Sequence, residues 1–464
     1  MDDSNTVHAG PWARGAPPPF ALPVREKFAY GLGDFASSLV FQTVGTFLMF
    51  YYTDIYGLSA AAVGTLLFAA RTADAVWDIY LGTLIDRTGG RWGQCRPYLL
   101  FGAPLLGLCA IATFSVPDGG AQFKLVYAYA SYMLLMMAYS VVNIPYGALP
   151  ALMTDDARDR TRLASWRMFC AFSCAILVNT SMIKLVEHLG AGDQRLGYQR
   201  TVAAMAIAAT LLFWLCFAGV RERVPPLVQP RHVRRDLRTL LAGRAWWMMA
   251  LIGTCMFTAV AITNGAAMYY FRYVVGDTAR AAPYFLCAGL GNLTGIVLSS
   301  RLTRRHCKRR VMLLASLGAA LLYAGFYFVD PAHPWALYLL GYAITCVGGI
   351  SLPIVFSMVA DTADDAELRS GRRMVGLTAS TIGFAIKLGL GLGGAVTGII
   401  LTLVGYQANV AQSAQAIEGL KLIMSAVPAI GKLLVCAIVL FYPLGQKKLD
   451  EIQPLLRRAR AGMA

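Results

Sequence analysis

Apolar residues are gathered into long runs that short polar segments separate along the whole chain. A helix that spans a membrane needs about 20 mostly apolar residues. Twelve runs meet this requirement, at about 28–52, 59–85, 98–117, 122–152, 164–188, 200–220, 245–275, 281–300, 311–329, 335–360, 374–404 and 416–443. They are too long for transmembrane strands and lack a strand's alternation of apolar and polar residues. The pattern therefore predicts an all-α membrane protein with twelve transmembrane helices.

Basic residues are concentrated in one set of alternating loops between these runs. These loops hold Arg87, Arg91 and Arg96, then Arg158, Arg160 and Arg162, then Arg301, Arg304, Arg305, Lys308, Arg309 and Arg310, and finally Arg369, Arg372 and Arg373. The other loops carry few basic residues. Because cytoplasmic loops are the ones enriched in Lys and Arg, we expect both termini in the cytoplasm. The chain is thus predicted to be a multi-pass protein of the cytoplasmic (inner) membrane.

The longest connector, residues 221–244, is rich in proline and arginine and falls between the sixth and seventh runs. It divides the chain into predicted segments: a disordered cytoplasmic tail (1–25), an N-terminal six-helix half (26–220), a cytoplasmic linker (221–244), a C-terminal six-helix half (245–443) and a second tail (444–464). Six spans on each side of a linker suggest two halves related by an internal repeat. The halves share little sequence, so the repeat rests on topology alone.

The composition removes several classes of function. Hydrophobic residues make up 57% of the 464 residues and charged residues 14%, against roughly 45–50% and 25% in average globular proteins. So few charges cannot cover a water-facing surface of this size, which excludes a typical cytosolic enzyme. The net charge of +16 is carried mainly by the loops, as in membrane proteins, and does not indicate nucleic-acid binding.

Motifs for bound cofactors and for catalysis are missing from the sequence. The 10 cysteines form no CxxC pair or Cys/His cluster, so neither a metal site nor a disulfide framework is predicted. The GxxxxGK[ST] motif of ATP-driven pumps is absent, and so is a nucleophile–base constellation. We therefore expect a transporter with no cofactor, rather than an enzyme. We also expect it to be monomeric.

Charged residues inside the second predicted span are the first candidates for chemistry. Asp74 and Asp78 are four residues apart and share one helix face, with Arg71 close to it. An unpaired carboxylate in hydrocarbon costs several kcal/mol, so this pair needs cations, partners or protons. Asp74 and Asp78 are predicted to exchange a coupling cation, H⁺ or Na⁺. A static ion-pair network that holds helices together is the alternative, and the two are compatible.

Polar residues on other spans are candidates for substrate binding. Asp34, Ser38 and Gln42 form a stripe on the first span, and Tyr139 and Asn143 share a face of the fourth. Carboxylate and amide groups bind hydroxyl-rich ligands such as sugars. A polar seam packed on another helix, with Asp34 paired to a basic residue, is the alternative for the first stripe.

Two basic residues within spans extend the candidate site. Arg167 begins the fifth span. Lys387 lies too deep in the eleventh for its side chain to reach the membrane surface. We expect Lys387 to pair with a carboxylate across the bundle or to hold a ligand oxygen. Lys432, in the last span, is a weaker candidate.

The loop that follows the second span contains alternating acidic and basic residues. It holds Asp86, Arg87, Arg91 and Arg96 in the spacing D-R-x-G-x-R-x-G-x-x-R-P. Ion pairs from such a loop could break and reform as the two halves rock. The spacing resembles the helix 2–3 signature of the major facilitator superfamily. An ordinary cytoplasmic loop is the alternative.

From about residue 27 to residue 446 the chain resembles the glycoside-pentoside-hexuronide:cation symporters, which include the melibiose permease. The resemblance rests on the motifs Tyr30-Gly31-Leu32-Gly33-Asp34, Tyr52-Thr53-Asp54, Asp74-x3-Asp78, Arg91-Trp92-Gly93, Asn143-Ile144-Pro145-Tyr146, Trp166-Arg167, the stretch from Tyr269 to Asp277, and Asp361-x2-Asp364-Asp365-x-Glu367. It implies the major facilitator fold and sugar–cation symport by alternating access. It also implies that Asp74, Asp78 and Ser140 belong to the cation site, and that Tyr139, Arg167 and Lys387 belong beside the sugar.

The chain departs from the melibiose permease at several of these positions. Ser38 and Asn143 stand where that permease has sugar-binding aspartates, which puts a galactoside in doubt and leaves open whether Asp34 or Ser38 replaces the first of them. Trp77 replaces an asparagine of the cation site. Since sodium prefers several oxygen ligands and a proton needs one carboxylate, we favour proton coupling.

Two other functions fit the sequence less well. A lysolipid carrier of the same superfamily would need an apolar cavity, which the polar stripes of the first and fourth spans oppose. A membrane sugar sensor with a transporter fold would signal through the tail or the linker. Saturable accumulation of a sugar would exclude that sensor.

Overall fold

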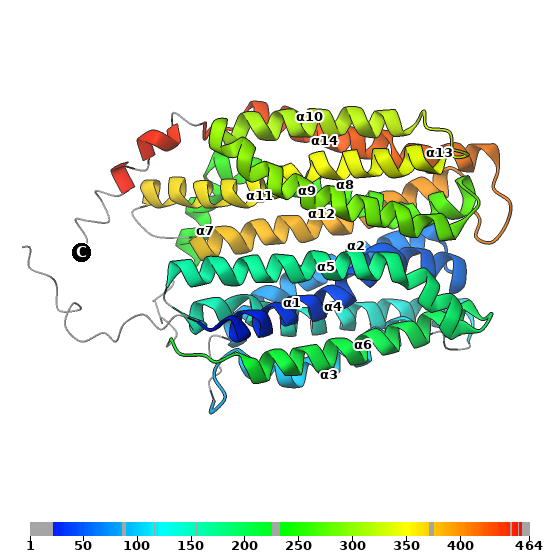
Figure 1. Cartoon of the computed structure of the whole chain (residues 1–464), viewed down its shortest axis with the longest axis horizontal. Coiled ribbons are helices and arrows are strands. Elements are labelled where there is room, and N and C mark those ends of the chain that lie inside the picture. The colour runs from blue at the N-terminus through cyan, green and yellow to red at the C-terminus, as the bar shows by residue number, and fades with distance from the viewer. Residues whose placement is uncertain are drawn as a thin grey trace, which may run out of the picture.

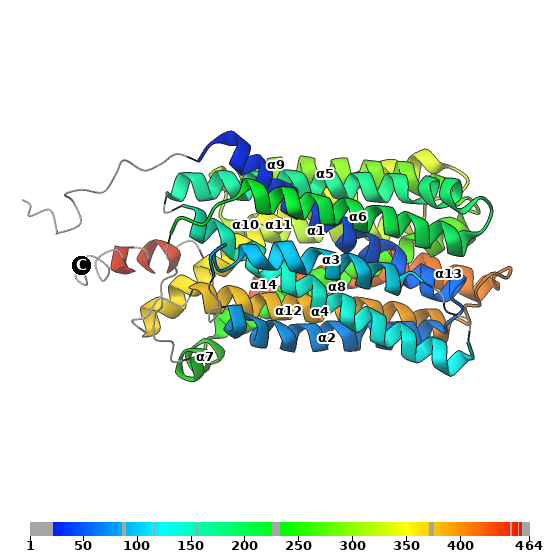
Figure 2. The same cartoon turned by 90° about the horizontal axis from the view of Figure 1, so that it is seen from below.

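The computed structural model describes residues 22–85, 90–115, 117, 119–154, 156–224, 233–370, 375–445, 448–452 and 454–456. The described part of the chain is built of helices that lie side by side along one long axis (Figures 1 and 2). Most buried side chains are apolar, as the predicted helical packing requires. The fold class predicted from the apolar runs, an all-α membrane protein, is therefore confirmed.

The first group of helices consists of α1 (Val24–Phe50), α2 (Ala60–Ile85), α3 (Arg96–Thr113), α4 (Ala121–Met153), α5 (Ala157–Gly190) and α6 (Gln194–Gly219). A short helix, α7 (Val233–Leu241), follows within the predicted linker. The second group consists of α8 (Arg244–Tyr269), α9 (Ala281–Arg305), α10 (Lys308–Phe326), α11 (Pro334–Ser370), α12 (Val375–Leu403), α13 (Ala414–Met424) and α14 (Ala426–Leu440). The two groups occupy the lower and upper parts of Figure 1.

Ten helical stretches among the described residues are long and apolar enough to cross a membrane. They confirm a multi-pass membrane protein. The helices α1 and α2 are not among the ten, and both carry charged residues within their length. The count of twelve spans and the cytoplasmic termini stay predictions, although the start of α1 and the last described residues lie at the same end of the bundle (Figures 1 and 2).

The last predicted span is broken, which the apolar pattern did not indicate. Helix α13 ends at Met424 and α14 begins at Ala426, with Ser425 between them at φ −122° and ψ −77°. Ser425 Oγ donates to the carbonyl of Lys421 at 2.6 Å. Pro428 has no N–H with which to continue the hydrogen-bond ladder across the break. The break lies inside an apolar run, so hydrophobicity alone could not reveal it.

The first helix of each group ends in the same unusual way. Helix α1 runs into a π-helical turn, η1 (Tyr51–Ile55), and α8 runs into another, η2 (Tyr270–Val274). The matching backbone bonds are Tyr56 N to Tyr51 O, Leu58 N to Tyr52 O, Val275 N to Tyr270 O, and Asp277 N to Phe271 O. Gly57 (φ 83°) and Gly276 (φ 76°) turn the chain at equivalent points, in a conformation that glycine adopts at little cost. These equivalent ends support the internal repeat expected from topology.

Helix α12 packs closely on α2, across the boundary between the groups. A Cβ atom added at Gly398 would lie 2.4 Å from the Ala60 carbonyl oxygen and 2.9 Å from the Gly64 Cα atom. Only residues without a bulky side chain allow two helices to approach this closely. The absence of a side chain at Gly398 therefore allows α12 to lie against α2, and Lys387 lies on the same helix.

Candidate functional site

Four predicted residues meet in one cluster between α2, α4 and α12, named here the coupling cluster. The Lys387 ammonium donates to Asp74 Oδ2 at 2.8 Å, to Ser140 Oγ at 3.2 Å, and to Asp78 Oδ2. Ser140 Oγ donates to Asp74 Oδ1 at 2.6 Å. Asp74 and Asp78 lie in the first helix group and Lys387 in the second, so the cluster ties the two groups together.

The members of the coupling cluster differ in burial and in their hydrogen bonding. The Asp74 side chain is fully buried, whereas those of Asp78 and Lys387 are 26% and 22% exposed. Asp78 Oδ1 is buried and finds no hydrogen-bond partner among the described residues. With two carboxylates and one ammonium, the cluster has one uncompensated negative charge and one free oxygen at which a cation could be held.

Asp34 pairs with Arg167 in a second polar contact, within the first helix group. Arg167 Nε donates to Asp34 Oδ1 at 3.1 Å. The guanidinium also lies over the ring of Tyr146, 5.4 Å from its centroid, at a distance where a cation and an aromatic face attract. Asp34 thus has the basic partner that the seam alternative required.

Tyr139 and Asn143 are brought together with Ser37, one residue before the predicted Ser38. Ser37 Oγ donates to the Tyr139 hydroxyl at 2.9 Å and to Asn143 Oδ1 at 3.4 Å. Sequence reasoning missed Ser37, although it lies three residues after Asp34 and thus near the same helix face. No hydrogen bond of the Ser38 side chain is found within the described part of the chain, and the residue is half-buried.

A cavity of about 370 Å³ lies between the two helix groups and is named here the central cavity. Among the predicted substrate-binding residues, Gln42 lines it; Asp34, Ser38, Tyr139, Asn143, Arg167 and Lys387 are not part of its wall. Polar wall residues that sequence reasoning did not select are Asn179, Thr263, Asn264, Asn292, Tyr323 and Thr345. Arg71 and Lys432 also line it. The only indication of these positions in the sequence was a single amide side chain, such as Asn179, Asn264 or Asn292, within an otherwise apolar helix.

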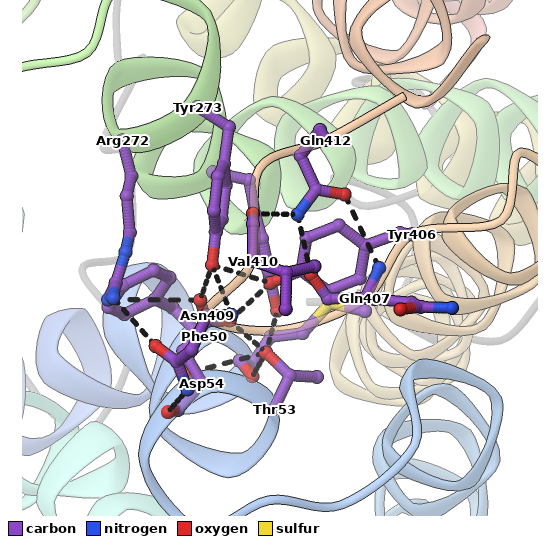
Figure 3. Close-up of polar contacts among 12 residues, drawn as sticks. Phe50, Thr53, Asp54, Arg272, Tyr273, Tyr406, Gln407, Asn409, Val410 and Gln412 are labelled. Atoms are coloured by element: carbon purple, nitrogen blue, oxygen red, sulfur yellow. Dashed lines mark hydrogen bonds and ion pairs between the residues drawn. The ribbon is translucent and has the colours of Figure 1, made fainter. Parts of the chain in front are cut away.

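The two π-helical ends meet at the end of the bundle away from the chain termini, where Asp54 is the centre of a polar network (Figure 3). The Asp54 carboxylate accepts from Tyr273 and, at 2.6 Å, from Tyr406, and Arg272 Nη1 lies 3.8 Å away. Asn409 Nδ2 donates to the Asp54 carbonyl at 2.6 Å. We call these five residues the Asp54 clasp. The clasp joins the end of α1 to the second helix group, and the Asp54 side chain within it is fully buried.

The predicted gating loop is described only in part. Asp86 and Arg87 lie outside the described residues. Arg96 Nη2 donates to the Phe217 carbonyl at 2.8 Å, and Arg91 lies over the Trp92 ring at 4.6 Å. These contacts all stay within the first helix group.

Glu222, which was not among the residues predicted from the sequence, organises this loop. Its carboxylate accepts from the backbone N–H groups of Gln94, Cys95 and Arg96 at 2.7–2.9 Å. A carboxylate at the beginning of α3 is favourable because the N–H groups of a helix's first turn are otherwise unsatisfied.

This arrangement is that of a secondary transporter: apolar helices in two groups, a cavity between them, and buried ion pairs that link the groups. The sequence model of the family described as "MFS/sugar transport protein" matches residues 29–446. The chain belongs to this family, which confirms the predicted relationship and the prediction of a transporter rather than an enzyme.

Two curated proteins and one solved structure are similar over nearly the whole chain. The inner membrane symporter YicJ of Escherichia coli (strain K12) is 34% identical, with 95% of this chain and 96% of YicJ covered. The glucuronide carrier protein homolog of the same organism is also 34% identical, with 92% and 94% covered. The inward open structure of the xylose transporter XylE from E. coli superimposes with a TM-score of 0.61 at 14% identity, covering 93% of this chain and 98% of XylE. The last similarity supports the major facilitator fold.

Proposed function

We propose that the protein is a proton-coupled symporter that carries a glycoside, pentoside or hexuronide across the cytoplasmic (inner) membrane by alternating access. The coupling cluster is the observation that carries the proposal. Its free carboxylate oxygen, on Asp78, and its single uncompensated negative charge suit the binding of one monovalent cation. The names of the relatives, a symporter and a glucuronide carrier homolog, support the substrate class.

A proton fits the coupling cluster better than a sodium ion does. Sodium needs several oxygen ligands, but the Lys387 ammonium already occupies the space between the two carboxylates. Trp77 offers only an indole N–H, which is a donor, and this N–H is buried without a partner among the described residues. A proton needs only the free oxygen of Asp78.

Alternating access requires that the contacts between the two helix groups break and reform. In this conformation the Asp54 clasp closes one end of the bundle. If the termini are cytoplasmic, the closed end is the periplasmic one and the central cavity is approached from the cytoplasm. The sugar would bind in this cavity, with the Asp34–Arg167 pair and the Ser37–Tyr139–Asn143 contacts ordering the helices of the N-terminal wall.

The experiment is to add xylosides, galactosides and glucuronides to energy-depleted cells that make the protein, and to record external pH with and without sodium. Alkalinisation on addition of one sugar, without sodium, is the expected result. Asp74→Asn should abolish the signal. Asp330→Asn is the control and should leave the signal unchanged, because Asp330 is an exposed loop residue. A sodium-dependent sugar signal without a pH change would contradict proton coupling. No response to any sugar would contradict the substrate class.

A further inference from the structure

We propose that Lys432 binds an acid group of the substrate, so that the central cavity selects a polyhydroxylated anion, such as a sugar acid, over the neutral sugar. This inference rests on the proposed function and narrows its substrate class. It assigns a specificity-determining role to α14, the last helix of the bundle.

Lys432 is buried and lacks the carboxylate partner that three other lysines, Lys27, Lys308 and Lys387, have. It is 5% exposed and lines the central cavity. Lys27 pairs with Asp159, Lys308 with Asp361 and Lys387 with Asp74 and Asp78, each at 2.8 Å or less. Lys432 makes no hydrogen bond or ion pair to any residue that the structure describes.

The remainder of the wall offers Lys432 no counter-charge. The described residues around the cavity include a second cation, Arg71, and no carboxylate. Arg71 comes from α2 in the first helix group and lies over the Phe41 ring, 5.4 Å from its centroid. The two groups thus each contribute one cationic residue to the same cavity.

The other polar wall residues suit hydroxyl groups. Gln42, Asn179, Asn264 and Asn292 place amides around the space. The Asn292 side-chain oxygen is buried and has no hydrogen-bond partner among the described residues. A buried acceptor without a donor is unfavourable, and a ligand hydroxyl would satisfy it once the Asn292 side chain turned toward the cavity. The volume of about 370 Å³ lies within the range of small-molecule sites.

An acid group matches this wall better than a further hydroxyl does. A buried ammonium without a counter-ion is unfavourable, and a hydroxyl oxygen offers it a dipole but no charge. A carboxylate supplies both the charge and a charge-assisted hydrogen bond. A free inorganic anion offers the same charge without the hydroxyls, so the test must distinguish a sugar acid from an inorganic anion.

The test compares two ligands that differ only at one carbon: methyl β-D-glucuronide and methyl β-D-glucoside. Their dissociation constants are measured by calorimetry on the purified full chain, and sulfate is titrated alone and as a competitor. The variants are Lys432→Gln, Lys432→Arg and, as a control, Lys184→Gln at an exposed position of α5. We expect the wild type to bind the glucuronide at least about tenfold more tightly than the glucoside.

Lys432→Gln should remove this preference and leave glucoside affinity within about twofold, while Lys432→Arg and Lys184→Gln should keep it. Equal affinities in the wild type, or an unchanged preference in Lys432→Gln, would overturn the inference and leave the sugar symporter intact. If Lys432→Gln does not fold, equal affinities of the wild type for the two ligands would still overturn the inference. Binding of sulfate and of neither sugar would contradict both the sugar-acid assignment and the proposed function, as would binding of no probe.

Discussion

At the scale of single residues, the coupling cluster is held together by charges that have little access to water. Asp74 is fully buried, and Lys387 reaches it from the other helix group. Removing one partner of a buried ion pair leaves the other uncompensated, which costs roughly 3–5 kcal/mol. The stability of the protein should therefore depend more on the net charge of the cluster than on the presence of any one of its side chains.

Lys387→Gln leaves two carboxylates without their ammonium, and we expect it to lower the melting temperature of the purified protein by several degrees. Lys387→Gln combined with Asp78→Asn restores the net charge of the wild-type cluster, so much of the loss should be recovered. Thermal unfolding of the wild type, both single variants and the double variant measures the interaction energy between positions 387 and 78. Additive effects of the two changes would contradict the pairing described here.

Residue spacing predicted part of this site. The four-residue separation of Asp74 and Asp78 placed them on one face of a helix, and the depth of Lys387 within its span required a partner across the bundle. Spacing does not reveal which helices face one another, so the contact between Ser37 and Tyr139 and the position of Lys432 in the cavity wall could not be predicted. Lys432 stands in the last predicted span, and its spacing there does not reveal that it lines the cavity.

At the scale of helices, the contact between α2 and α12 positions the coupling cluster. Gly398 lies against the Ala60 carbonyl, whereas a Cβ atom added at Gly383, on the same helix, would have no neighbour within 4 Å. These two glycines therefore form a matched pair. One is needed for close approach and the other is not.

Gly398→Ala should force α12 away from α2, because its methyl group would clash with backbone atoms, and should destabilise the protein by about 1–3 kcal/mol. Gly383→Ala should be neutral or slightly stabilising, because alanine is the better helix former. Thermal unfolding and sugar uptake are measured for both variants. Equal effects of the two substitutions would show that the close contact does not position the cluster.

Helix positions were predicted well from the apolar runs because lipid-facing and core-facing residues are both apolar in a membrane protein. The break at Ser425 and the π-helical ends of α1 and α8 were not predicted. They depend on backbone hydrogen bonds, and the residues around them are as apolar or aromatic as those of an uninterrupted helix. Asp54 falls just outside the first predicted span, 28–52, although it forms the centre of the clasp.

At the scale of the whole molecule, the two helix groups are joined at one end by the Asp54 clasp (Figure 3) and, near the middle of α12, by the coupling cluster. The two equivalent π-helical ends approach one another at the clasp, where Thr53 Oγ1 and the Tyr269 hydroxyl are 2.7 Å apart. Equivalent helix ends from the two groups thus form the two sides of this closed end. Such a repeat suggests that the protein exchanges between two conformations related by symmetry.

Asp54→Ala should weaken this closure, because Tyr273, Tyr406 and Arg272 lose their shared acceptor. We expect a cysteine introduced at Asn264, in the cavity wall, to react several-fold faster with a membrane-impermeant maleimide added at the clasp end. Asp277→Ala is the control, since Asp277 lies at the same end and pairs locally with Arg280. Unchanged labelling in Asp54→Ala would mean that the clasp does not keep this end closed.

The most direct test of proton coupling is sugar accumulation in sodium-free proteoliposomes under an imposed pH gradient, acidic outside. The wild type should accumulate the transported sugar above its external concentration. Asp78→Asn should lose this accumulation but retain exchange of labelled for unlabelled sugar, because the cavity is intact and only the proton site is removed. Accumulation that requires sodium and ignores the pH gradient, or wild-type accumulation by Asp78→Asn, would contradict a proton carried at the coupling cluster.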